Sequence, residues 1–107
     1  MKMIFRLTIL VGLCLTLGCK ESKHVPANHT ILIQGMKFQP AQLSVDEGDS
    51  VTWINKDLVA HNIVALPDSA WRSSVLASGA SWTLVPGKSS DYYCSIHVVM
   101  KGKIEVK

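Results

Sequence analysis

Three side chains that can bind soft metal ions follow one another at intervals of three residues near the end of the chain. Cys94, His97 and Met100 supply a thiolate, an imidazole and a thioether. If this segment forms a tight loop between two strands, the three side chains can converge on one point. Thiolate and thioether are soft ligands that select copper. The spacing therefore predicts a copper site.

A trigonal copper site needs a second imidazole beside the thiolate. His61, which Asn62 follows at the start of a predicted strand, is the only good candidate. His24 and His29 are interpreted as residues of a polar N-terminal tether. Taken singly, a Cys or a Met is more often a core residue than a ligand. Taken together, the side chains predict a metal site with four ligands, which are His61, Cys94, His97 and Met100.

Other functions are less consistent with these residues. A structural zinc site accepts Cys and His but not a thioether, so Met100 argues against it. A copper carrier or storage protein is the main alternative, but such proteins have surfaces rich in Met and His, and only Met36 and Met100 follow the first 18 residues. No arrangement typical of a hydrolase or a phosphate loop has supporting context, and the acidic residues of the turns are expected to face solvent. Four protein ligands also leave no open position for a substrate. The chain is predicted not to be an enzyme.

The segments that must position these ligands alternate between polar and apolar residues, which is the period of a β-strand. In residues 50–55, for example, Val51 and Trp53 share one face, while Thr52 and Ile54 share the other. Strands are expected over residues 30–34, 42–45, 50–55, 61–66, 81–85, 91–94 and 103–106. No stretch after residue 20 has the length and caps of an ordinary helix. Short strands separated by Gly, Pro, Asn and Asp predict an all-β sandwich or barrel.

The first 18 residues have a different character. Lys2 and Arg6 precede an apolar run over residues 7–17, which is short for a bilayer span and has the length of a signal-peptide core. We interpret residues 1–18 as a lipoprotein-type signal peptide, 19–28 as a polar tether and 29–107 as one folded domain. The segment 16–19 resembles a bacterial lipoprotein processing site ending in Cys19. We expect an exported, periplasmic protein that a lipid on Cys19 anchors to the membrane; cleavage to a soluble periplasmic protein is the alternative.

Removal of this leader changes the charge and cysteine content of the chain. Nine basic and eight acidic residues remain, a net charge of +1, which is not the balance of a nucleic-acid-binding protein. With Cys19 lipidated, Cys94 is the one cysteine of the folded domain, which then has no internal disulfide. A lone thiol in an oxidising compartment is a liability unless a metal occupies it.

The residues around the predicted ligands resemble the cupredoxins, or type I (blue) copper proteins. The chain is most similar to the amicyanins and more distantly similar to plastocyanin and pseudoazurin. The resemblance extends over residues 30–106 and rests on segments 36–38, 45–55, 61–62 and 94–100, with Gly102 behind the last. It implies a Greek-key β-sandwich and one copper ion that cycles between Cu(I) and Cu(II). It also implies electron transfer between redox proteins such as a dehydrogenase, a cytochrome or a reductase.

The resemblance also assigns roles to individual residues. The metal would be bound by two imidazole Nδ1 atoms, a thiolate and a long axial thioether, from His61, His97, Cys94 and Met100. Asn62 would join the two ligand loops through Ser95, and its backbone N–H would point at the Cys94 sulfur. Ile96 and Val98 flank His97 where the family usually has proline, a departure that affects the expected rigidity of the loop and the partner surface.

Overall fold

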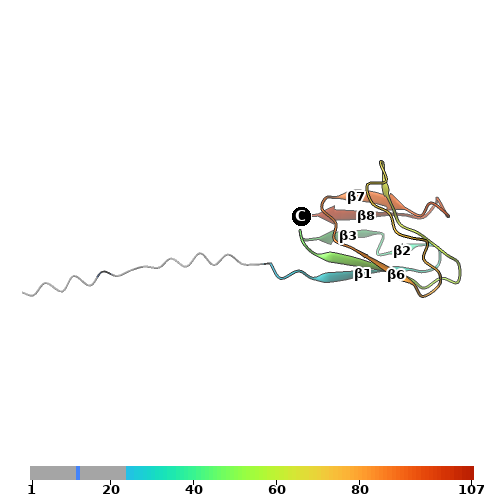
Figure 1. Ribbon diagram of the computed structural model, residues 1–107, viewed down its shortest axis with the longest axis horizontal. Helices are drawn as coiled ribbons and strands as arrows, with labels where there is room; N and C mark the ends of the chain where they lie inside the picture. Colours follow the sequence, from blue (N-terminus) through green and yellow to red (C-terminus); the bar gives the residue numbers. More distant parts are fainter. Residues whose placement is uncertain (1–11, 13–23) are drawn as a thin grey trace, which may run out of the picture.

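Eight strands form two packed β-sheets in the computed structural model, which describes Gly12 and residues 24–107 (Figure 1). These residues contain no helix that is long and apolar enough to cross a membrane. The predictions for the leader and for Cys19 concern residues outside the described part of the chain. The predicted all-β sandwich is confirmed.

The first sheet carries the N-terminal strand of the domain. Its strand order is β2, β1, β4 and β6, which are Phe38–Gln39, Asn28–Ile33, Ser50–Asn55 and Ser81–Leu84. β1 lies parallel to β4, with Asn28 opposite Ser50 and Ile33 opposite Asn55. Because these two strands start at the same end of the sheet, the residues before β1 and before β4 are neighbours in space.

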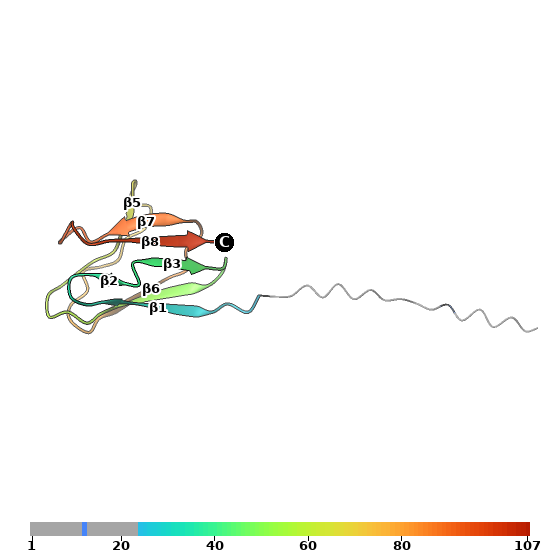
Figure 2. The same cartoon turned by 180° about the vertical axis from the view of Figure 1, so that it is seen from behind.

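The second sheet carries the C-terminal strand. Its order is β3, β8, β7 and β5, which are Gln42–Val45, Lys101–Val106, Ser90–Tyr93 and Val64–Leu66. β3 is parallel to β8, whereas β7 is antiparallel to both of its neighbours. The β7–β8 loop therefore projects from one end of the sandwich, opposite the end at which β1 starts (Figures 1 and 2).

Aromatic rings join the two sheets. In β4, Val51 and Trp53 are fully buried and Thr52 and Ile54 are half-buried, as the alternation predicts. The Trp53 ring meets Tyr92 of the other sheet edge-on, with centroids 5.5 Å apart. Such edge-to-face pairs add to the stabilisation that burial of the rings provides.

Tyr92 depends on a glycine in the neighbouring strand. It lies directly opposite Gly102 in the β7–β8 pair. A Cβ atom on Gly102 would lie 2.1 Å from Cζ and 2.3 Å from the hydroxyl oxygen of Tyr92. The side chain of Tyr92 therefore occupies the space that any other residue at position 102 would need.

Several strand bounds differ from the sequence predictions by one or two residues, and two differences are larger. β5 begins at Val64 rather than at His61, and β2 was not predicted because a two-residue strand shows no alternation. His61 instead forms an isolated bridge with Leu76, in which each backbone N–H donates to the other residue's carbonyl, at 3.1 and 2.7 Å. This bridge fixes the backbone of His61 outside the regular sheet.

A buried carboxylate fastens the N-terminal segment to the domain. Asp49 is buried, which contradicts the expectation that the acidic turn residues face solvent. Its carboxylate accepts a hydrogen bond from the backbone N–H of Ala27 at 2.9 Å and contacts the rings of His24 and His29 at 2.6 and 2.9 Å. Part of the segment interpreted as a tether therefore contacts the domain directly.

Candidate metal centre

Two loops at one end of the sandwich bring the predicted ligands together. Cys94 and Met100 begin and end the loop between β7 and β8, and His61 follows β4. The backbone N–H of Cys94 donates to the carbonyl of Met100 at 3.1 Å, and the N–H of Met100 donates to the carbonyl of His97 at 3.0 Å. These two bonds close the loop, which agrees with the compact turn that the three-residue spacing predicts.

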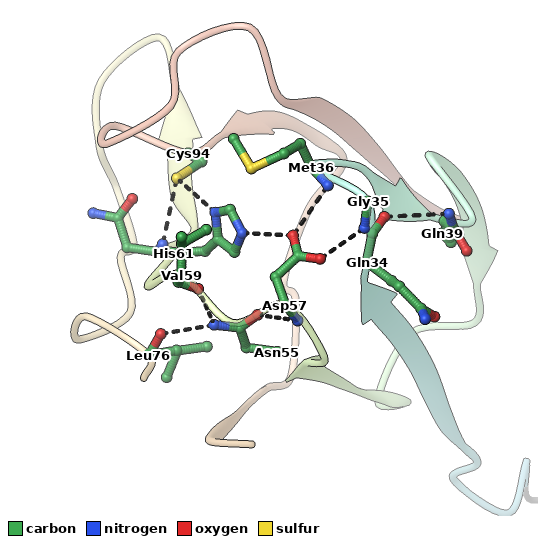
Figure 3. Close-up of polar contacts among 11 residues, drawn as sticks. Gln34, Gly35, Met36, Gln39, Asn55, Asp57, Val59, His61, Leu76 and Cys94 are labelled. Atoms are coloured by element: carbon green, nitrogen blue, oxygen red, sulfur yellow. Dashed lines mark hydrogen bonds and ion pairs between the residues drawn. The ribbon is translucent and has the colours of Figure 1, made fainter. Parts of the chain in front are cut away.

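Three of these side chains, those of His61, Cys94 and His97, lie close to one another. His61 and Cys94 are fully buried, and His61 Nδ1 lies 3.8 Å from Cys94 Sγ (Figure 3). The ring of His97 is half-buried, and its centroid is 5.0 Å from that of His61. Met100 is buried at the end of the same loop. The structure thus gathers all four predicted ligands at one end of the sandwich.

Asn62 connects the two ligand-bearing segments. Its side-chain amide donates to the Ser95 hydroxyl at 2.7 Å and accepts a hydrogen bond from the Ser95 backbone N–H at 2.8 Å. Its backbone N–H is directed at Cys94 Sγ, at 3.5 Å. These contacts are the ones that the family resemblance implies. A donor to sulfur stabilises negative charge on a thiolate, so Asn62 can tune a bound metal.

Asp57 is a functional residue that the sequence analysis missed. Its carboxylate lies 2.8 Å from His61 Nε2 and accepts hydrogen bonds from the backbone N–H groups of Gly35 at 2.7 Å and Met36 at 3.0 Å (Figure 3). Burial acts to raise the pKa of Asp57, but the hydrogen bonds from Met36, His61 and Gly35 outweigh it and lower the pKa below its ordinary value. A proton on Nε2 leaves Nδ1, the nitrogen that faces Cys94, free to bind a metal.

Asn55 holds the turn that carries Asp57 and His61. It is fully buried at the end of β4, and its side-chain amide donates to the carbonyls of Val59 and Leu76, both at 2.9 Å. Its side-chain oxygen accepts the backbone N–H of Asp57 at 3.0 Å. The position of His61 therefore follows from the buried end of β4 and from the bridge to Leu76.

The donor set fits copper. A buried thiol with an N–H directed at its sulfur can be stabilised as a thiolate, and two imidazoles and a thioether lie in the same group of residues. Cys94 forms no disulfide within the described residues. Soft sulfur ligands combined with imidazole favour copper over magnesium, calcium or manganese. The fold and this donor set are those of a small copper-binding β-sandwich protein.

Comparison with known proteins agrees with this class. Residues 25–107 match the family of copper-binding proteins that includes plastocyanin and azurin. Amicyanin of Paracoccus denitrificans is 33% identical over 81 residues, covering 70% of this chain and 62% of that protein. This chain therefore spans less than two thirds of that relative's length. The chain belongs to the plastocyanin/azurin family of copper-binding proteins, which confirms copper as its metal and its resemblance to amicyanins.

Solved structures share the fold. An oxidized amicyanin mutant superimposes with a TM-score of 0.70 at 28% identity, covering 75% of this chain and 82% of the other. A copper-containing nitrite reductase from Thermus scotoductus gives a TM-score of 0.69 at 26% identity, but the match covers 78% of this chain and only 22% of the reductase. The same sandwich thus occurs in a small copper protein and as a part of a larger enzyme.

Removing the negative charge of Asp57, whose carboxylate contacts His61, should weaken metal binding. We expect Asp57→Asn to lower copper affinity about tenfold, which is the lower end of the effect of losing a residue that orients a metal ligand. One amide oxygen cannot accept the three N–H donors that the two carboxylate oxygens now accept. Competition with a copper chelator measures the change. Asp91→Asn, at an exposed position of β7, is the matched control. Equal affinities of the two variants would contradict the role of Asp57.

Proposed function

We propose that this protein is a one-electron carrier in which His61, Cys94, His97 and Met100 hold one copper ion. The observation that carries the proposal is the gathering of these four residues, from two loops, at one end of a β-sandwich. Copper bound by such a set supplies reversible one-electron chemistry between Cu(I) and Cu(II). Four protein ligands leave no position for a substrate, which favours a carrier over an enzyme.

The protein's contribution is to hold the ligands in place. Asp57 and the Leu76 bridge fix His61, while the paired hydrogen bonds between Asn62 and Ser95 fix the two loops relative to each other. Because these contacts do not involve the metal, they support the ligand geometry in both oxidation states. A site whose atoms move little when the charge changes is suited to rapid electron transfer.

The edge of His97 is the proposed point of electron exchange. His97 is half-buried, whereas the side chains beside it are apolar and exposed: Ile96 is 46%, Val98 60% and Val99 82% accessible. Such an exposed apolar surface suits contact with a redox protein, since the centres of protein interfaces are depleted in charged residues. We infer that a dehydrogenase, a cytochrome or a reductase docks here.

A visible spectrum and a voltammogram test the proposed function. The copper-loaded protein should be intensely blue when oxidised, colourless when reduced, and should give a reversible one-electron wave. A Cu(II) protein that is not blue and gives up its copper readily would favour the alternative, a copper carrier or storage protein.

The N-terminal residues support a proposed location. The basic start, the short apolar run and the segment ending in Cys19 are typical of an exported lipoprotein. We expect wild-type protein in the membrane fraction and Cys19→Ala in the soluble fraction or unprocessed, because the lipid attaches to this cysteine. Cell fractionation with immunoblotting measures this, and Cys14→Ala is the matched control. Equal partitioning of wild type and Cys19→Ala would favour release as a soluble periplasmic protein.

A further inference from the structure

A second group of metal-binding side chains lies at the opposite end of the sandwich. Its members are His24, Asp46 and Asp49, and one ligand atom from each lies within 4.8 Å of the other two. His24 Nε2 is 2.6 Å from Asp49 Oδ1 and 3.8 Å from Asp46 Oδ2. Asp49 precedes β4, whereas Asn55 ends it beside the copper ligands. At about 3.3 Å per residue, the two groups are about 20 Å apart.

Asp49 is the fixed member of this group. Its side chain is 2% exposed, and backbone N–H groups of Ala27 and Asp46 donate to Oδ1 and Oδ2, at 2.9 and 3.1 Å. The hydrogen bond from His29, followed by those from Ala27 and His24, holds the pKa of Asp49 well below its usual range. The carboxylate is therefore ionised and oriented without any contribution from a metal.

His29 approaches the carboxylate from its other oxygen. Its Nε2 lies 2.9 Å from Asp49 Oδ2, whereas His24 contacts Oδ1. A carboxylate that binds a metal through one oxygen is commonly held by a hydrogen bond to the other, and such outer partners contribute to metal affinity. His29 occupies that position.

We propose that His24, Asp46 and Asp49 bind one Zn²⁺ ion, with water completing its coordination and His29 orienting the Asp49 carboxylate. Zinc accepts imidazole nitrogen and carboxylate oxygen at about 2.0 to 2.2 Å, so two of its ligand atoms lie about 3 to 4 Å apart. The His24–Asp46 separation already falls in this range. The His24–Asp49 contact must widen by about half an ångström.

The widening is feasible because His24 belongs to the exposed N-terminal segment, with a side chain 44% accessible, while Asp49 stays in place. The ion takes the place of the proton between His24 Nε2 and Asp49, and that proton passes to solvent. Zinc bound here links the chain at residue 24 to the turn before β4. It would fix the direction in which the N-terminal segment leaves the domain.

Zinc titration of the copper-loaded protein tests the site. Filling the copper centre first keeps Zn²⁺ away from Cys94, and an unchanged blue band shows that the copper stays bound. Competition with a chromophoric zinc chelator should give one saturable site per chain. His24→Ala should lower the zinc affinity at least about tenfold, and His29→Gln should lower it about tenfold through the orientation of Asp49.

Glu47→Gln is the matched control, because it removes an acidic charge from the same turn at an exposed position outside the group. Its zinc affinity should stay within about twofold of wild type, because Glu47 supplies no ligand atom and an exposed charge interacts only weakly with its neighbours in water. Affinity that His24→Ala leaves unchanged, or that Glu47→Gln lowers as much as His24→Ala does, would overturn the proposal. Absence of a saturable zinc site in the wild-type protein would overturn it as well. None of these results bears on the copper centre, which the blue band monitors separately.

Discussion

Replacing Cys94 with serine is expected to abolish the intense blue absorption of the copper-loaded protein and its electron transfer, while the β-sandwich remains folded. The thiolate is the ligand that gives a His₂Cys copper site its characteristic absorption, and a hydroxyl does not replace it. The loop should keep its shape, since its closing hydrogen bonds are made by the backbone of residues 94, 97 and 100. Visible absorption and far-ultraviolet circular dichroism together measure both effects.

Met100→Leu is the control for Cys94→Ser, because it also alters one end of the ligand loop. This variant should stay blue, and its reduction potential should rise because a weak donor to Cu(II) has been lost. If the Cys94→Ser protein were as blue as wild type, Cys94 would not be a copper ligand. Loss of the β-sheet spectrum in that variant would show instead that the thiol has a structural role.

Adding one methyl group at position 102 is expected to destabilise the domain by about 3 kcal/mol, at the upper end of the range for overpacked cores. In Gly102→Ala the new Cβ would meet the Tyr92 ring at 2.1 Å. That ring cannot move aside, because it is fully buried and packs against Phe38 and Trp53 with centroids 4.8 and 5.5 Å away. Chemical denaturation followed by circular dichroism measures the free energy of unfolding.

Gly87→Ala is the matched control for this change. A Cβ at Gly87 meets no heavy atom within 4 Å, so the substitution should be nearly neutral. Combining Gly102→Ala with Tyr92→Leu should cost less than the sum of the two single changes, since the smaller side chain removes the clash. Additive effects, or a Gly102→Ala protein as stable as Gly87→Ala, would show that the strands separate to accommodate the methyl group.

The burial of Tyr92 should also be visible in its ionisation. Burial raises the pKa of Tyr92 to about 12, whereas an exposed tyrosine ionises near 10. Because the unfolded chain loses this proton first, the domain loses stability as the pH rises above about 10. An ultraviolet titration should therefore show Tyr92 ionising later than an exposed tyrosine. A Tyr92→Phe variant that titrates like wild type would contradict the assignment.

Much of the fold could be predicted because it depends on local patterns. The alternation of polar and apolar residues in 50–55 correctly predicted β4 and its buried face. The spacing from Cys94 to Met100 correctly predicted a closed loop. The predicted start of β5, at His61, lies three residues before the observed start at Val64. His61 belongs to a bridge with a residue 15 positions later, and no local alternation reports such a pairing.

The residues around the site were predictable only where a specific resemblance marked them. Asn62 and Ser95 were found in this way, and their hydrogen bonds agree with it. Asp57 was missed because its contact with His61 depends on the conformation of the intervening turn, which Asn55 fixes from the core. Asp49 was misjudged because an acidic residue in a turn is normally solvated, whereas here several donors surround it.

The parallel pairing of β1 with β4 places the start of the folded domain at the end of the sandwich opposite the copper ligands. The chain enters the domain beside Asp49, at the pole farthest from His97, and the C-terminus lies at that same pole (Figures 1 and 2). An object attached at the exposed Val25 or at the C-terminal Lys107 is therefore kept about one domain length from the half-buried ring of His97. A fluorescent label, a fusion partner or a solid support could be attached at either of these positions without blocking the surface around the copper ligands.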